Sequence, residues 1–299
     1  MRKGNGMKFL DLFAGIGGFR LGMEMAGHEC VGHCEIDKFA NASYIAMHKP
    51  KEDEWFADDI TRVRAVDIPG ADCWCFGFPC QDISVAGKQG GFTSGKRSSL
   101  FFTVTGLIRE LEEENRPAIL FIENVKNLLS INGGFDFAKL LIELDEIGYD
   151  AEWQVLNSKN FGVPQNRERV FIIGHLRGRG RRKVFPVSDD GKGNTSAVRR
   201  YLRGMRKDCF GCILTRPNKG DRANLDTLIY DYKNNTVRQP TPRECFLAQG
   251  FPEEYFNRVK DIQPEKELYK QAGNSVTVNV IYEIAKRLEV QNEPINKEI

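Results

Sequence analysis

The segment GFPCQ at residues 77–81 places a cysteine where it could act as a nucleophile. The run before it, ADCWCF at 71–76, is short and apolar like a buried strand, and the Pro, Gly and Ser beyond it predict a loop. Cys80 is therefore expected at the carboxyl end of a strand, the edge where open α/β sheets bind ligands. A free cysteine is as often an inert packing residue. The pentapeptide alone leaves both interpretations open.

A glycine-rich turn, AGIGG at residues 14–18, follows a predicted strand and opens a helix. Gly15 and Gly17 would let the backbone approach a ligand and would direct helix N-terminal amides towards it. Glu35 comes at the predicted end of the second strand, where a carboxylate can accept hydrogen bonds from ribose hydroxyls. Asp59, before the next predicted strand, could meet an adenine edge. The GxGG spacing suits a nucleoside cofactor without a pyrophosphate, and an ordinary tight turn is the alternative.

These candidate residues depend on a regular alternation of elements over the first 176 residues. We predict strands at 7–13, 29–36, 71–76, 118–122, 151–156 and 169–173, and helices at 18–26, 37–47, 99–113 and 135–147. Such alternation indicates an α/β fold with a doubly wound, mainly parallel sheet. The rhythm stops at about residue 175, and helical periodicity returns at 242–249 and 276–288. We therefore expect one domain over 1–176, completed by 266–299, and a smaller irregular domain over 177–265.

Composition is that of an ordinary globular chain of 299 residues, 41% hydrophobic and 28% charged. We find no apolar run of 18 residues, and the first ten residues lack the apolar core of a signal peptide. These features predict a cytoplasmic protein. The eight cysteines lack the dense even spacing of small secreted domains, so reduced thiols are expected.

Positive charge is concentrated in residues 175–222, which hold 14 Lys and Arg against four Asp. Because the whole chain has a net charge of only +2, the remainder is acidic overall. A basic segment in an acidic chain is typical of a surface that binds a polyanion. The run RGRGRRK at 177–183 is its densest part, and a solvated surface loop is the alternative.

Taken in order, the motifs of this chain resemble those of DNA (cytosine-5)-methyltransferases of the bacterial or phage type. They are DLFAGIGGFRLG at 11–22, GFPCQ at 77–81, ENV at 123–125, QNRERVFIIG at 165–174, TPRE at 241–244, QGFP at 249–252 and QAGNSV at 271–276. The set spans nearly the whole chain, and only the basic segment lacks a match. The family has its variable target-recognition region there. The resemblance implies a sheet of the S-adenosylmethionine-dependent methyltransferase type and makes 177–265 the DNA-binding domain.

The resemblance also implies a mechanism. The Cys80 thiolate would add to C6 of a flipped-out cytosine, so that C5 can attack the methyl group of S-adenosyl-L-methionine. Glu123 would share a proton with N3, Arg169 would hold O2, and Arg167 would position Cys80, Glu123 or a nearby phosphate. We expect both arginines to alternate with Gln165 on one face of a strand.

Cofactor and DNA contacts are implied in the same way. Phe13 could stack on the adenine, and the full cofactor set is Phe13, Gly15, Gly17, Glu35, Asp59, Pro79, Asn274, Ser275 and Val276. The loop at 81–98 and the basic segment are expected to contact double-stranded DNA through Gln81, Ser84, Lys88, Arg97, Arg181, Arg182 and Lys183. A monomer is expected, with a cognate restriction endonuclease as a further partner acting on the same site.

Two cysteine pairs are assigned no chemistry. Cys209 and Cys212 have zinc-like spacing but no second Cys or His pair nearby, so no metal is expected. Cys73 and Cys75 alternate along a buried strand and are expected to be packing residues. The competing functions are a tRNA-directed cytosine-5 methyltransferase, a catalytically silent DNA-binding protein, and an amino-methylating enzyme, whose expected Pro-Pro-aromatic motif FPCQ does not provide.

Overall fold

The computed structural model describes residues 6–78, 99–179, 182–188, 212–213, 229–231, 234 and 236–289. Its strands are β1 (Lys8–Leu12), β2 (Glu29–Cys34), β3 (Trp55–Ala57), β4 (Cys73–Phe76), β5 (Ile119–Val125), β6 (Tyr149–Asn157), β7 (Glu168–Leu176), β8 (Ile229–Asp231) and β9 (Thr236–Arg238). Its α-helices are α1 (Gly18–Met25), α2 (Lys38–His48), α4 (Ser99–Glu110), α5 (Phe135–Glu146), α7 (Pro242–Ala248), α8 (Glu253–Val259), α9 (Glu265–Asn274) and α10 (Val278–Ala285).

Seven strands form one sheet in the order β3-β2-β1-β4-β5-β7-β6. β3, β2, β1, β4 and β5 pair in parallel, whereas β7 runs antiparallel to both β5 and β6. The predicted doubly wound, mainly parallel sheet is therefore confirmed, and each predicted strand and helix matches an observed element to within a few residues. The sequence prediction missed β3, α8, α9 and the short hairpin of β8 and β9. Because β3 is the true third strand, Asp59 follows it closely.

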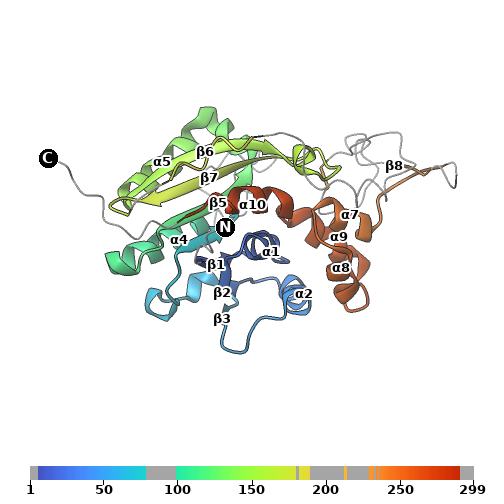
Figure 1. Ribbon diagram of the computed structural model, residues 1–299, viewed down its shortest axis with the longest axis horizontal. Helices are drawn as coiled ribbons and strands as arrows, with labels where there is room; N and C mark the ends of the chain where they lie inside the picture. Colours follow the sequence, from blue (N-terminus) through green and yellow to red (C-terminus); the bar gives the residue numbers. More distant parts are fainter. Residues whose placement is uncertain are drawn as a thin grey trace, which may run out of the picture.

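Helices cover both faces of the sheet (Figure 1). On one face α4 and α5 share a hydrophobic cluster with the sheet, to which Val104, Leu140, Leu10 and Leu12 belong. On the other face α1 and α10 share a second hydrophobic cluster, in which Ile281 is fully buried. The C-terminal helix α10 therefore packs back against the sheet. No helix in the described part of the chain has the length and apolar character to span a membrane.

α7, α8 and α9 gather at one end of the molecule, beside α2 (Figure 1). α7 begins with a capping box in which Thr241 and Glu244 each bind the other's backbone N–H. The cluster beneath these helices joins Phe246 and Ile213 of the predicted second domain to Ile16 and Met47 of the first. Part of the segment expected to contact DNA is thus fixed to the body of the protein.

Candidate active site

The topology brings distant motifs to one edge of the sheet. The carboxyl ends of the five parallel strands meet at that edge, where open α/β sheets bind ligands. Because β7 is antiparallel, its first residues lie at the same edge, and Arg169 pairs in register with Val125 at the end of β5. Glu123 and Arg169 therefore project from neighbouring strands next to the end of β4.

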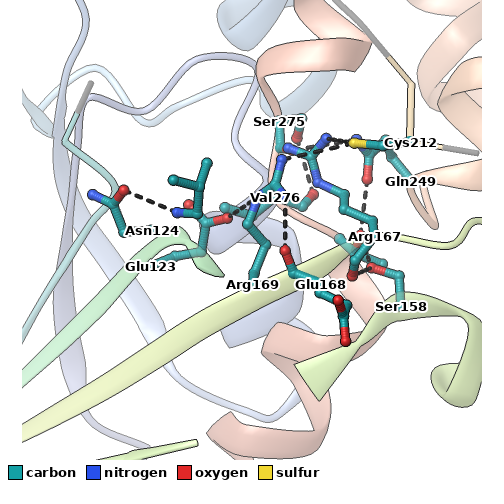
Figure 2. A network of polar contacts seen from close by, with 12 residues as sticks. Glu123, Asn124, Ser158, Arg167, Glu168, Arg169, Cys212, Gln249, Ser275 and Val276 are labelled. Atoms are coloured by element: carbon teal, nitrogen blue, oxygen red, sulfur yellow. Dashed lines mark hydrogen bonds and ion pairs between the residues drawn. The ribbon is translucent and has the colours of Figure 1, made fainter. Parts of the chain in front are cut away.

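Glu123 and Arg169 form an ion pair, with 3.1 Å between Arg169 Nε and Glu123 Oε1 (Figure 2). The two side chains are 12% and 17% exposed, so a substrate could still reach them. Arg169 Nη1 also donates to the carbonyl of Glu168 at 2.8 Å. A Cβ added to Gly77 would lie only 3.1 Å from Glu123 Oε2. The segment after β4 thus approaches the Glu123 carboxylate closely. Any side chain at position 77 would crowd this carboxylate, and glycine avoids that contact.

Asn124 fixes the chain that leads to Cys80. Its buried side chain donates from Nδ2 to the carbonyl of Phe78 at 3.2 Å and accepts the N–H of Val125 at 2.9 Å. Phe78 precedes Cys80 by two residues. From sequence, Asn124 was part of the ENV motif without a predicted role of its own. Its position in that motif, after the candidate catalytic carboxylate, was the available signal.

Arg167 is almost fully buried, at 4% exposure. Its Nη2 donates to the carbonyl of Ser275 at 2.9 Å and its Nη1 to Cys212 Sγ at 3.3 Å. Burial and then the charge of Arg169 lower the pKa of the Arg167 guanidinium. The expected placement of Gln165 and Arg167 on a strand is wrong, because both precede the start of β7. The described side-chain hydrogen bonds of Arg167 run to the C-terminal segment and to the predicted second domain.

The glycine-rich turn after β1 adopts an unusual backbone. Phe13, Gly15 and Gly17 have φ values of 53°, 57° and 77°, in the left-handed region that glycine tolerates and phenylalanine avoids. Strain of this kind persists where the surrounding structure enforces it, often at ligand sites. A Cβ added to Gly15 meets no heavy atom within 4 Å, so there is room for a ligand beside the turn.

His48 supports the same turn, and the sequence analysis missed it. Its Nε2 lies 2.9 Å from the carbonyl of Ile16, and a Cβ at Gly17 would come within 2.2 Å of that nitrogen. Because a carbonyl only accepts, Nε2 must carry the proton and donate. Burial lowers the pKa of His48 to about 3, so the ring is neutral near pH 7.

Glu35 links the turn to the segment after β2. Its Oε2 accepts the N–H of Gly15 and its Oε1 accepts the N–H of Asp37, each at 2.7 Å. Burial raises the pKa of Glu35, and these two hydrogen bonds oppose the rise. Asp59, after β3, accepts from the backbone and hydroxyl of Thr61. A carboxylate beside open space at the glycine turn fits the ribose of a nucleoside cofactor.

The QAGNSV motif lies against the start of α1. A Cβ at Gly18 would be 2.7 Å from both Ser275 Oγ and Val276 Cγ2. Ser275 and Val276 are buried, whereas Asn274, the last residue of α9, is exposed. The structure thus brings Ser275 and Val276, which are candidate cofactor residues, next to the glycine-rich turn.

The remaining candidates lie on the surface or beyond the described residues. Arg182 and Lys183 are exposed, and Arg182 Nη1 forms an ion pair with Glu289 Oε1 at 2.6 Å. Cys73 and Cys75 are fully buried with their sulfurs 3.7 Å apart, which confirms the packing assignment. Within the described ranges no cluster of three or more His, Cys, Asp or Glu could hold a metal. Seven candidates lie outside these ranges: Pro79, Cys80, Gln81, Ser84, Lys88, Arg97 and Arg181.

Comparison with known proteins identifies the family. Residues 7–191 and 187–290 match the family described as C-5 cytosine-specific DNA methylase. The chain belongs to this family. It is 32% identical over 313 residues to the type II methyltransferase M.DsaV of Dactylococcopsis salina, covering 94% of this chain and 86% of that one. It is 33% identical over 324 residues to the type II methyltransferase M.Bsp6I of Bacillus sp. (strain RFL6), covering 94% and 98%.

A solved structure shows the same fold. The Dnmt2 methyltransferase of S. pombe matches with a TM-score of 0.69 at 20% identity, covering 93% of this chain and 97% of that one. The predicted family and the S-adenosylmethionine-dependent methyltransferase fold are both confirmed. The chain is a DNA (cytosine-5-)-methyltransferase, related to type II restriction-modification enzymes. Family and fold together imply S-adenosylmethionine as the methyl donor.

Proposed function

We propose that this enzyme methylates C5 of a flipped-out cytosine at a specific sequence in duplex DNA, through a covalent adduct on Cys80. The observation that supports this most directly is the Glu123–Arg169 ion pair at the edge of the sheet. Gly77 lies against that pair, and Asn124 holds Phe78 there, two residues before Cys80. A base delivered to this edge would meet a carboxylate, a guanidinium and the segment that carries the nucleophile.

The chemistry follows from the weak nucleophilicity of cytosine C5. Addition of the Cys80 thiolate to C6 pushes an electron pair onto C5, and covalent catalysis thereby divides one difficult step into easier ones. Glu123 shares a proton with N3 and withdraws electron density from the ring, while Arg169 donates hydrogen bonds to O2. After methyl transfer, the proton on C5 leaves to a base and its electron pair expels the thiolate. Cys80 is then free for another cycle.

S-adenosylmethionine, when bound, supplies an electrophilic methyl group. Glu35 would accept hydrogen bonds from its ribose hydroxyls, and the open space beside Gly15 would admit the nucleoside. Phe13 would stack on the adenine, and Asp59 would meet its edge. The remaining residues of the proposed cofactor site are Gly17, Pro79, Asn274, Ser275 and Val276.

DNA binding is assigned to the predicted domain at 177–265 and to the loop at 81–98. Arg182 and Lys183 are exposed and support this assignment. Gln81, Ser84, Lys88, Arg97 and Arg181 belong to the same proposed set. We further propose a cytoplasmic monomer that acts on double-stranded DNA and shares its site with a restriction endonuclease.

The test is to express the enzyme in cells that lack cytosine methylation and to sequence their DNA after bisulfite treatment. We expect full protection of one cytosine in one short sequence, and no protection with Cys80→Ser or Glu123→Gln. Purified enzyme is then compared on duplex DNA containing that sequence and on tRNA. Methylation of tRNA in preference to duplex DNA, or of cytosines without a common sequence, would refute the proposal.

A further inference from the structure

Cys212 comes from the predicted DNA-binding domain but contacts both arginines of the active site (Figure 2). Its sulfur accepts from Arg167 Nη1 at 3.3 Å and lies 3.8 Å from Arg169 Nη2. The cysteine is half-buried. Sulfur is a weak acceptor but a large and polarizable one, so it can serve two donors at longer distances than oxygen would.

The next residue fixes the segment in place. The backbone N–H of Ile213 donates to Gln165 Oε1 at 3.0 Å. The Ile213 side chain is 4% exposed and is buried in the hydrophobic cluster of α7, α8 and α9. Cys212 therefore cannot move away from the arginines without breaking a buried hydrogen bond and exposing an apolar side chain.

Gln165 itself belongs to a rigid frame. It is fully buried, and its Nε2 donates to the carbonyl of Ala248 at 3.1 Å and to Gln249 Oε1 at 3.2 Å. Gln249 in turn donates to the carbonyl of Ser275 at 3.3 Å, the same oxygen that Arg167 binds. The position of Cys212 is thus set by groups from three separate motifs.

Among the described residues, three groups contact Arg169: the Glu123 carboxylate, the Glu168 carbonyl and the Cys212 sulfur. The Arg167 side chain has fewer partners, the Ser275 carbonyl and the Cys212 sulfur, and in the described part of the chain its buried Nε has none. Cys212 is therefore a larger share of what holds Arg167 in place. In the described part of the site, the guanidinium groups of Arg167 and Arg169 lie close together, and the Glu123 carboxylate pairs with Arg169. Like charges repel, so such an arrangement needs groups that fix the position of each arginine. The sulfur between them receives a donor from each.

We propose that Cys212 is a positioning residue that holds Arg169 in the orientation in which it pairs with Glu123. The segment at 212–213 thereby links the predicted DNA-binding domain to the catalytic pair. This inference rests on the proposed roles of Glu123 and Arg169. The new element is that Cys212, a residue outside the shared motifs, controls the geometry of the Glu123–Arg169 pair.

The test compares substitutions of Cys212 in single-turnover methylation of a duplex carrying the target sequence. Cys212→Ala and Cys212→Val both remove the acceptor, and Val also fills the space, whereas Cys212→Ser keeps an acceptor. We expect Ala and Val to lower the rate about three- to tenfold, as for a lost hydrogen bond in the transition state, while KM for DNA changes less than about twofold. Cys212→Ser should restore most of the rate. Cys245→Ala, which removes a buried thiol from the cluster that holds Ile213, is the matched control and should keep the wild-type rate.

Each result decides the matter. Wild-type rates in both Ala and Val variants would overturn the proposal. A loss in Cys212→Ser as large as in Cys212→Ala would show that hydrogen-bond acceptance is not its role. A rise in KM with unchanged single-turnover rate would assign Cys212 to DNA binding alone. If the wild-type enzyme methylates its site while Glu123→Gln does so equally well, the proposed catalytic pair fails, and that outcome is distinct from a failure at Cys212 alone.

Discussion

We expect the free energy of unfolding to fall less on acidification in His48→Gln than in the wild-type protein. The His48 ring is buried against Gly17 and donates from Nε2 to the carbonyl of Ile16 at 2.9 Å. Burial holds its pKa at about 3. A glutamine amide can still donate to the same carbonyl but has no charge to gain between neutral pH and pH 5.

The sign and size follow from linkage. In the unfolded chain histidine has a pKa of about 6.5, so it takes up a proton as the pH falls while folded His48 stays neutral. Stability contributed by neutral His48 is therefore present above the unfolded pKa and is lost from about pH 6.5 down towards pH 3. Between pH 7.5 and pH 5 this loss lowers the free energy of unfolding by about 2 kcal/mol. The unfolded-state pKa sets its size, because the folded-state pKa lies well below 5.

Urea unfolding at both pH values measures this contribution. The wild-type loss of unfolding free energy should exceed that of His48→Gln by about 2 kcal/mol. Tyr255→Phe is the control. Tyr255 packs on the His48 ring, and the substitution removes a hydroxyl group from this contact while His48 itself is kept. That variant should show the wild-type pH dependence. Equal acid losses in wild type and His48→Gln would refute a neutral, buried His48.

Three further predictions concern ligands. Glu35→Ala should weaken S-adenosylmethionine binding by about 1 to 3 kcal/mol through lost charge-assisted hydrogen bonds, and wild-type affinity in calorimetry would remove Glu35 from the site. Because burial raises its pKa, wild-type cofactor affinity should fall on acidification at a higher pH than an ordinary glutamate would give. Neutralising Arg181, Arg182 and Lys183 together should weaken DNA binding and flatten its salt dependence, since fewer counterions are released. An unchanged salt slope would make this run an idle surface.

The sheet could be predicted because its central strands are buried on both faces. Such strands read as short continuous apolar runs, as β4 and the first half of β5 do. Six of the seven strands of the sheet were predicted. β3 was missed because it has three residues, lies at the edge of the sheet, and stands between acidic residues, with Phe56 half exposed. α9 was missed because its first turn is charged and it holds few apolar residues, so no apolar run marks it in the sequence.

Sequence motifs identified candidate residues of the site but not the contacts that hold them in place. Glu123 and Arg169 meet because each motif places its residue at the same edge of the sheet. Arg167 was the arginine expected to position Cys80, Glu123 or a phosphate, and its described side-chain contacts are to Ser275 and Cys212 instead. The contacts of Cys212 and Gln165 could not be read from sequence. They join side chains to backbone or sulfur across more than 40 residues, and no spacing rule covers such pairs. Cys212 was instead considered as half of a zinc-like pair.

Covalent trapping tests the central claim most directly. Fluorine at C5 cannot leave as a cation, so a duplex carrying 5-fluorocytosine at the target should hold the enzyme once the methyl group has moved. We predict an adduct that requires S-adenosylmethionine, survives denaturation and maps to the peptide containing Cys80. Cys80→Ser should abolish it, whereas Cys30→Ser, which keeps a donor to the carbonyl of Gly32, should not. An active preparation that methylates the normal duplex yet forms no adduct, or forms one through another cysteine, would contradict the account.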